Sequence, residues 1–270
     1  MEGMITTTSS KDGSILNIIK NIFKSYYSVL LMVALWELVG TLKLINPFLV
    51  PPLEKVLGSL YWMAASGILF IETGITLKRA LLGFFISIAI SVPIGIGMSR
   101  IKFIKWFFDP IISIGFPAPK IAFLPVICLW FGMYDTSKVI LAILSCSFPI
   151  IIETYLGTLE TDKFLIWSAQ NMGMKDKKLL WKVIFPMTLP QIFNGIQIAA
   201  PISLVTIVLA EMLAGGRGLG AYMMVSGRFA RSDQVFAALV VLAILGYLLM
   251  AAMVRVRKRL LTWHEEAQKD

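Results

Sequence analysis

The sequence predicts an all-α, polytopic membrane protein with six transmembrane helices and both termini in the cytoplasm. Three observations lead to this prediction. First, 57% of the 270 residues are hydrophobic, only 15% are charged and the mean hydropathy is +0.80, whereas a soluble domain has about 25% charged residues. Second, the apolar residues form six runs of the length that crosses a bilayer as a helix. Third, Lys and Arg are concentrated on one set of loops.

The six apolar runs follow one another along the chain. They cover, to within a few residues, 26–45, 76–98, 107–131, 139–159, 189–213 and 235–254. The first run follows a mostly polar segment, is longer than the apolar part of a signal peptide and has no small-residue cleavage site after it. We therefore expect it to remain in the protein as a span.

The distribution of positive charge predicts the orientation. Most Lys and Arg residues lie before the first span, after the second and fourth spans, and after the sixth, and loops rich in these residues are cytoplasmic. The chain then divides into a cytoplasmic N-terminal segment 1–24, a six-span domain 25–258 and a cytoplasmic tail 259–270. Because the net charge of +9 mostly reflects this bias, we do not expect nucleic acid as a partner.

The residues that usually build catalytic or metal sites are scarce. The two cysteines, Cys128 and Cys146, lie in apolar runs, and the single histidine, His264, lies near the C-terminus. This set cannot form a common zinc or haem site. No phosphate-binding G-x-x-x-x-G-K-[ST] loop occurs, and the glycine-rich segment 215–220 does not match that pattern. We expect no catalytic residue, no metal and no cofactor.

The second span contains a regular series of small residues. They recur every four positions, at Gly83, Ser87, Ser91, Gly95 and Ser99. In a bilayer, small residues let helix backbones approach closely, so a packing face is favoured over a face that lines the path of a substrate. Pro93 is expected to bend this helix.

The third span is rich in proline, with Pro110, Pro117, Pro119 and Pro125, and it contains Lys120. We do not expect a continuous helix through residues 116–119. Irregular backbone at membrane depth is tolerated where it is buried in protein or lines a water-filled cavity, so Pro117, Pro119 and Lys120 are candidates for a translocation path. A kinked helix at the cytoplasmic interface, with Lys120 reaching the surface, is an equally good interpretation.

Three carboxylates, Glu37, Glu153 and Glu211, lie inside predicted spans, where charge is costly. For Glu37 and Glu153 we expect a structural pairing with an Arg or Lys. For Glu211, which precedes the glycine-rich segment, such a pairing and a place at the mouth of a translocation path are equally supported.

The cytoplasmic segment 161–187 is too long for a simple connection between spans. Thr161 or Asp162 can cap a helix that runs to Met172, and Gly173 suits the left-handed position that ends such a helix. The segment is therefore expected to form a helix–glycine–helix elbow.

The second half of the elbow has helix signals of its own. Asp176 lies in its first turn and Lys182 near its end, where each charge complements the helix dipole. Pro186 and Pro190 are then expected to break or redirect the chain. Spacing alone supports two interpretations equally, a docking element for a cytoplasmic protein and an amphipathic segment on the membrane surface.

This segment resembles the signature loop of the integral membrane permeases of ABC importers. That pattern is Glu-Ala-Ala, three residues, Gly, nine residues and Ile-x-Leu-Pro. Here Trp167-Ser168-Ala169 stands in place of Glu-Ala-Ala, Gly173 follows at the right distance, and Val183-Ile184-Phe185-Pro186 ends the pattern. The acidic first residue is absent from this chain.

Other stretches resemble the nitrate/sulfonate/taurine class of these permeases. They are LWEL at 35–38 with FLVPPLEKV at 48–56, PAPKIAFLP at 117–125 with LWFG at 129–132, and AEML at 210–213 with GLG at 218–220. The similarity extends from about residue 30 to residue 255.

The resemblance implies a fold like that of type I ABC importer permeases in the cell membrane. It also implies a second permease subunit as partner, usually an identical copy, a cytoplasmic ABC ATPase dimer that binds the ATP, and an extracytoplasmic substrate-binding protein. The expected solute is a small anion similar to a sulfonate, nitrate or taurine. A pyrimidine precursor or riboflavin is the alternative within the family, and an ATPase-independent secondary transporter is the alternative outside it.

The resemblance and the residue pattern together indicate two groups of functional residues. The residues expected to couple the chain to the ATPase are Trp167, Ser168, Ala169, Asn171, Met172, Gly173, Met174 and Pro186. The residues considered for the translocation path are Pro117, Pro119, Lys120 and Glu211.

Overall fold

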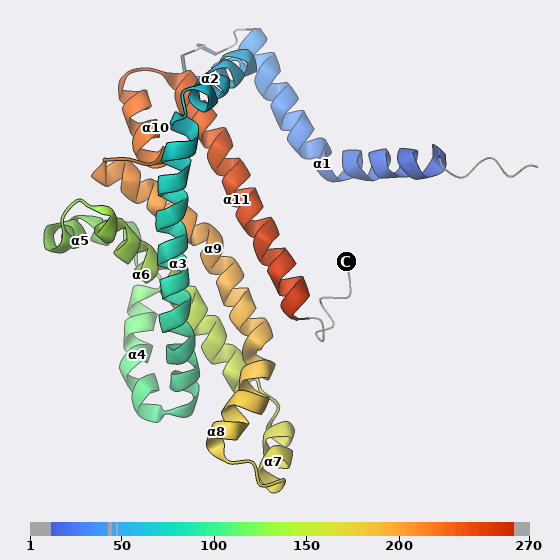
Figure 1. The fold of residues 1–270 in the computed structure, drawn as a ribbon, viewed down its shortest axis with the longest axis vertical. Helices are drawn as coiled ribbons and strands as arrows, with labels where there is room; N and C mark the ends of the chain where they lie inside the picture. Colours follow the sequence, from blue (N-terminus) through green and yellow to red (C-terminus); the bar gives the residue numbers. More distant parts are fainter. Residues whose placement is uncertain (1–11, 43–44, 47, 262–270) are drawn as a thin grey trace, which may run out of the picture.

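The computed structural model describes residues 12–42, 45–46 and 48–261, with side chains from residue 27 onward, and this part of the chain contains helices but no strand (Figure 1). The helices are α1 (Asp12–Thr41), α2 (Leu53–Ala65), α3 (Ile68–Arg100), α4 (Lys102–Gly115), α5 (Leu124–Phe131), α6 (Asp135–Leu159), α7 (Lys163–Asn171), α8 (Asp176–Leu179), α9 (Phe185–Ala214), α10 (Leu219–Arg228) and α11 (Ser232–Leu260). A 3-10 turn (Lys120–Phe123) precedes α5, and a π turn (Leu180–Ile184) joins α8 to α9.

The described residues include four helices that are long and apolar enough to cross a membrane. They are α3, α6, the continuous helix Asp176–Ala214 and α11. The helix α4 and the segment Lys120–Phe131 meet at a bend of 100° and make a fifth crossing if the bent pair is one span. The described apolar part of α1, Tyr27–Thr41, is shorter. The all-helical membrane fold is thus confirmed, while the number of six spans stays a prediction.

The centre of the molecule is formed by α3, α6 and α9, and the small residues of α3 make this packing possible. A Cβ atom added to Gly83 would lie 2.6 Å from the Cβ of Ala142, and one added to Gly95 would lie 2.7 Å from the Cβ of Thr154, both on α6. Ser87, between these glycines, is fully buried. The regular series of small residues is therefore a packing face, as the sequence predicted.

A second cluster of buried side chains ties the shorter helices to α11 at one end of the molecule (Figure 1). The indole ring of Trp36 on α1 lies 5.4 Å from the ring of Phe236 on α11, and its Nε1 donates to the carbonyl of Pro51. The neighbouring Glu37 accepts a hydrogen bond of 3.1 Å from the amide of Leu53, the first residue of α2. Glu37 therefore has a structural partner, but this partner is a helix N-terminus rather than the predicted Arg or Lys.

The expected break at Pro186 and Pro190 does not occur. Residues Asp176–Ala214 form one continuous helix that passes through the π turn. Pro186 lies in the first turn of α9, directly after the π turn, where the amide of Phe185 already bonds to the carbonyl of Leu180. The wider turn rearranges the hydrogen bonds next to the proline, so the missing N–H does not end the helix.

Predictions about the chain ends are only partly covered by the structure. The second span begins at Ile68, several residues before its predicted start, and α1 begins at Asp12, inside the predicted segment 1–24. Residues 1–11 and 262–270, including His264, lie outside the described residues.

Candidate functional site

The elbow predicted between the fourth and fifth spans is present and is built by helix capping. The carboxylate of Asp162 accepts a 2.8 Å hydrogen bond from the amide of Phe164 and caps α7. At the other end, Gly173 has φ of +79°. The amide of Gly173 bonds to the carbonyl of Gln170, and the amide of Met174 bonds to that of Ala169. These two bonds are the Schellman pattern that ends a helix at a left-handed residue.

A small core stabilises the elbow. The side chains of Ala169, Leu179 and Ile184 are buried against one another, and Met174 packs on them. Met172 points the other way and is 78% exposed. The elbow is therefore a compact unit with one apolar side chain at its tip.

The residues expected to couple this chain to an ATPase separate into two groups. Trp167, Ser168, Asn171, Met172 and Gly173 are exposed, whereas Ala169, Met174 and Pro186 are buried or half-buried and support the elbow. In Figure 1 the elbow lies at the lower end of the molecule, beyond the end of α4. Nothing lies within 4 Å of a Cβ atom added to Gly173, so the tip is open on that side.

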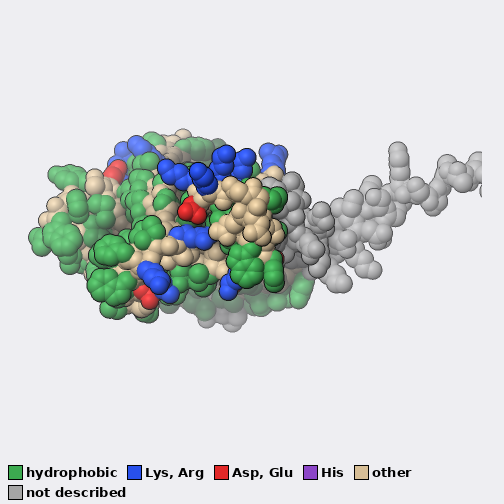
Figure 2. All heavy atoms as spheres, turned by 90° about the horizontal axis from the view of Figure 1, so that it is seen from below, with side chains coloured by type: hydrophobic (Ala, Val, Ile, Leu, Met, Phe, Trp, Pro, Cys, Tyr) green, Lys and Arg blue, Asp and Glu red, His purple; other side chains and the backbone are tan. Residues whose placement is uncertain are grey.

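Basic side chains surround the elbow. The view from this end of the molecule shows many Lys and Arg side chains and few acidic ones (Figure 2). The exposed basic residues of the segments at this end are Arg100, Lys102, Lys105, Lys163, Lys175, Lys177, Lys178, Lys182, Arg255, Lys258 and Arg259. This is the face that the sequence assigned to the cytoplasm.

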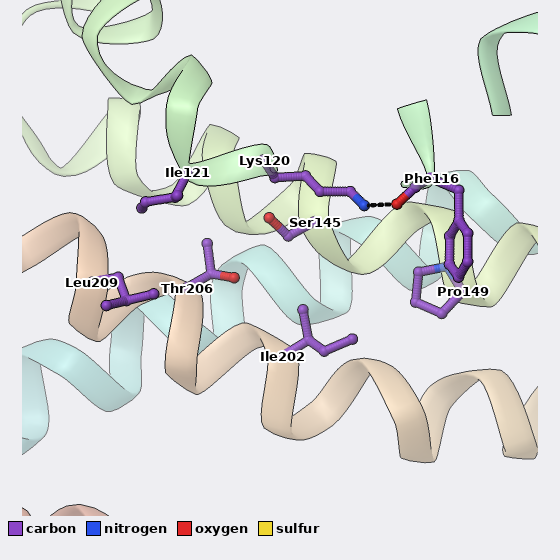
Figure 3. A pocket seen from close by; sticks show the side chains of 8 residues that line it. All are labelled: Phe116, Lys120, Ile121, Ser145, Pro149, Ile202, Thr206 and Leu209. Carbon is purple, nitrogen blue, oxygen red and sulfur yellow. Dashed lines mark hydrogen bonds between the residues drawn. The ribbon is translucent and has the colours of Figure 1, made fainter. Parts of the chain in front are cut away.

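A cavity lies beside the bend between α4 and α5. Helix α4 ends at Gly115, where an added Cβ atom would lie 2.5 Å from the ring of Phe148 on α6. After the bend, the chain continues through Lys120 into α5. The cavity has a volume of about 230 Å³, and its walls come from the bend, α6 and α9. They are formed by Phe116, Lys120, Ile121, Ser145, Pro149, Ile202, Thr206 and Leu209, and we call this space the Lys120 cavity (Figure 3).

Among the described residues, Lys120 is the only charged side chain in the wall of this cavity. Its ammonium group donates to the carbonyl of Phe116 and lies 5.2 Å and 5.1 Å from the ring centroids of Phe116 and Phe148. Ser145 and Thr206 bring hydroxyl groups to the wall, and the other lining side chains are apolar (Figure 3). The cavity thus combines one positive charge and two hydroxyls with an apolar surface.

The cavity lies well inside the length of α6 and α9. Ser145 is ten residues from the start of α6 and Thr206 eight residues from the end of α9, which corresponds to about 12 to 15 Å along each helix. Lys120 is separated by the whole of α4 from the turn at Ile101, which belongs to the basic end that the sequence assigned to the cytoplasm. Pro117 and Pro119 are exposed on the bend, outside the lining of this cavity.

Glu211 lies in a different environment, in the last turn of α9. Its side chain is fully buried. Its carboxylate accepts hydrogen bonds from the hydroxyl of Thr76 at 2.9 Å, from Nη1 of Arg79 at 2.5 Å and from the amide of Gly220 at 3.1 Å. The sequence left open whether Glu211 pairs with a cation or lies at the mouth of a translocation path, and the structure shows a pairing with Arg79. The partner is a cation on α3 that the sequence reasoning overlooked.

Arg79 connects this carboxylate to two other parts of the molecule. Its Nη2 lies 2.5 Å from Oδ1 of Asp135 at the start of α6, and its Nη1 also donates to the carbonyl of Arg217. Lys138 on α6 donates to the carbonyl of Gly215 at 2.7 Å. The two cations therefore hold the glycine-rich turn between α9 and α10.

Glu72, in the first turns of α3, also binds the glycine-rich turn. Its carboxylate accepts from the amide of Gly218 at 2.5 Å and from the guanidinium of Arg217 at 3.1 Å. Gly218 has φ of +116°, and a Cβ atom there would lie 2.2 Å from the carboxylate of Glu211. We call these side chains, Glu72, Thr76, Arg79, Asp135, Lys138 and Glu211, the Arg79 cluster.

Arg79 had a recognisable signal in the sequence, because it is a cation inside an apolar run. Its partners could not be identified from the sequence, because they lie on other helices. Glu153, for which a cation was also expected, is partly buried on α6 against Gly195 of α9. Among the described residues, no Lys or Arg forms a salt bridge with Glu153, so that expectation was wrong for this part of the chain.

The chain is similar to known transport proteins in sequence and in fold. The model of the family described as binding-protein-dependent transport system inner membrane component matches residues 87–262. The taurine transport system permease protein of Escherichia coli K12 is 33% identical over 242 residues, which cover 88% of each chain. The putative aliphatic sulfonates transport permease protein of Bacillus subtilis 168 is 29% identical and covers 86% of this chain and 84% of its own.

The fold similarity extends to solved structures. An inward-facing form of the MetNI methionine ABC transporter matches with a TM-score of 0.65 and 20% sequence identity. The match covers 73% of this chain and 98% of the other. At this level of identity, the match concerns the fold alone.

Proposed function

The chain belongs to the family of binding-protein-dependent transport system inner membrane components, and from this premise we propose that it moves a small sulfonate-like anion across the membrane. As a member of this family, it is a membrane-spanning subunit of an ATP-driven ABC importer and not an enzyme. ATP hydrolysis belongs to a separate ATPase subunit, and a separate binding protein supplies the solute.

The observation that supports the coupling mechanism best is the elbow at α7 and α8. It has its own buried core, it ends in the exposed Met172, and it continues through the π turn into α9 without a break. A force applied at the tip is therefore transmitted to a helix of the central bundle. We propose that the exposed residues of the elbow contact the ATPase and that Ala169, Met174 and Pro186 support them.

The proposed cycle follows from this connection. ATP binding brings the ATPase subunits together, the elbows move with them, and the permease switches between its inward-facing and outward-facing states as rigid bodies. A second, identical copy of the chain completes the permease. The bend with Pro117, Pro119 and Lys120 forms part of the path, and Glu211 supports the extracytoplasmic end of that path from within the Arg79 cluster.

The solute class rests on the relatives and on the charge of the bend. Two relatives are named for transport of taurine and of aliphatic sulfonates. Both solutes carry a sulfonate, and Lys120 supplies a positive charge to the wall of the cavity. A small solute with a sulfonate group fits these observations.

The coupling role is tested by an exposed apolar residue on the elbow and a matched one elsewhere. Met172→Glu should abolish co-purification with the ATPase and transport, while the chain still inserts into the membrane. Leu260→Glu makes the same kind of change at a half-exposed residue at the end of α11, away from the elbow, and should leave both unchanged. Normal transport by a properly inserted Met172→Glu chain would contradict the proposed role of the elbow, as would normal transport after deletion of residues 167–178.

A further inference from the structure

Among the described residues, Arg79 and Lys138 are buried between the helices, whereas Lys120 is half-buried at the bend. Arg79 pairs with two carboxylates, and Lys138 bonds to the carbonyl of Gly215 and lies near the charges of Glu211 and Asp135. Lys120 differs, because no carboxylate of the described residues forms a salt bridge with it. Its partners are the carbonyl of Phe116 and two aromatic rings. A charge inside a predicted span with such weak partners indicates a functional site.

A second observation in the same cavity also indicates a ligand. The Thr206 side chain is only 8% exposed, lines the cavity and makes no hydrogen bond to another described residue. Because this hydroxyl faces the cavity without a protein partner, it is available to bond to water or to a ligand. The cavity has about 230 Å³, far more than the roughly 10 to 15 Å³ that one water molecule needs. It therefore has room for a small solute.

The chemistry of the walls favours one class of solute. The ammonium group and the hydroxyl of Thr206 can donate hydrogen bonds to an anionic oxygen, whereas no wall side chain carries a negative charge to bind a cation. The hydroxyl of Ser145 already donates to the carbonyl of Leu141. The side chains of Ile121, Ile202 and Leu209 offer apolar contacts to a short carbon chain. The carbonyl of Phe116 keeps the ammonium group bonded when no solute is near, and it can release this group to a stronger acceptor.

We propose that the Lys120 cavity binds the anionic group of the transported solute and makes the path selective for anions over cations. This inference rests on the proposed import function and assigns its selectivity to one side chain. Lys120 binds the sulfonate or carboxylate oxygen, Thr206 binds the same group from α9, and the apolar wall holds the carbon chain.

The test compares two thiol reagents of opposite charge in the complete transporter. The chain with Thr206→Cys, Cys128→Ser and Cys146→Ala is reconstituted with its ATPase and binding protein. Its modification rate is measured with 2-sulfonatoethyl methanethiosulfonate, an anion, and with 2-(trimethylammonium)ethyl methanethiosulfonate, a cation. We expect Lys120→Met to lower the ratio of the anion rate to the cation rate about tenfold, and Lys120→Arg to retain the ratio.

A matched lysine serves as the control. Lys105→Met removes a positive charge from an exposed position on α4 that does not line the cavity, and it should leave the ratio unchanged. An unchanged ratio in Lys120→Met would overturn the proposal, and so would resistance of the thiol introduced by Thr206→Cys to both reagents at every stage of the ATP cycle. The rates should also be the same in vesicles with and without phosphatidylglycerol, because suppression by this lipid would identify a lipid headgroup as the anion instead of the solute.

Vesicles that carry the chain with its native Thr206, with and without Lys120→Met, separate this inference from the import function. Uptake of radiolabelled taurine and ATP hydrolysis stimulated by the loaded binding protein test import directly. If the Lys120→Met chain takes up taurine with the KM and rate of the parent chain, the anion site is refuted and the importer stands. If the parent chain shows neither taurine uptake nor stimulated hydrolysis while the labelling ratio still depends on Lys120, the import proposal is refuted and the anion site stands.

Discussion

Arg79 and Lys120 are both cations among the membrane helices, and their surroundings are opposite. Arg79 is fixed by the carboxylates of Glu211 and Asp135 and by a backbone carbonyl. Lys120 has one carbonyl, two aromatic rings and an open cavity. The first arrangement has a fixed set of strong partners, and the second leaves binding capacity unused. The carboxylate partners fix Arg79 in the structure, and the absence of such partners among the described residues leaves Lys120 available to a solute.

The energetic consequences of removing the charge are opposite as well. Taking one partner from a buried ion pair leaves an uncompensated charge and is strongly destabilising. Replacing a poorly partnered cation by an apolar residue removes a desolvation cost instead. Stability measurements can therefore test this comparison independently of transport.

The largest expected effect is that of Glu211→Ala. The change leaves Arg79 with one carboxylate partner, the mostly solvent-exposed Asp135, and removes the acceptor for Thr76 and Gly220. We expect a loss of about 3 to 5 kcal/mol in the free energy of unfolding, measured as the midpoint of thermal unfolding in detergent. Glu72→Ala should cost less, because its partner Arg217 is largely exposed. Equal losses for the two variants would contradict the central place of Glu211 in the cluster.

The next effect is that of Gly218→Ala, which tests how tightly the cluster holds the turn. An alanine Cβ would meet the Glu211 carboxylate at 2.2 Å, and its φ of +116° is unfavourable for alanine. We expect a loss of about 2 to 3 kcal/mol. Gly215→Ala is the matched control, because φ there is also positive while nothing lies within 4 Å of the added Cβ. If both variants lose the same stability, the close approach of Glu211 is irrelevant.

A smaller effect is expected at the elbow, which lies outside both regions. Gly173→Ala places a side chain at φ of +79° with no steric contact, so the left-handed backbone alone should cost about 1 kcal/mol. Gly173→Pro should uncouple transport from ATP hydrolysis, because proline cannot adopt a positive φ, while insertion is retained. Normal coupling in an inserted Gly173→Pro chain would argue against the elbow as the lever.

The smallest change in stability is expected for Lys120→Met. The ammonium group has only one hydrogen-bond partner among the described residues. Its removal should therefore change the free energy of unfolding by no more than about 1 kcal/mol, and either an increase or a decrease of this size agrees with the proposal. The measurement is the same thermal midpoint, combined with the uptake assay. A loss comparable to that of Glu211→Ala would mean that Lys120 is a structural cation like Arg79.

Some features were predictable because they depend on neighbouring residues. The elbow follows from the cap at Asp162 and the left-handed glycine at Gly173, both of which act over a few residues. The break near Pro117 follows from proline sterics and is present as the 100° bend. The expected break at Pro186 and Pro190 failed, because the π turn before them rearranged the backbone hydrogen bonds.

Hydropathy and helix capping are properties of local sequence. The amino-acid sequence was therefore sufficient to predict a helical membrane protein, the positions of most of its long helices and the form of the elbow. Only the tertiary structure decided which charges are paired. Arg79 and Glu211 are 132 positions apart, and Lys120 meets Ser145 and Thr206 only where the bend, α6 and α9 come together. The energy of a buried charge depends on every group around it, and in this protein those groups come from different helices.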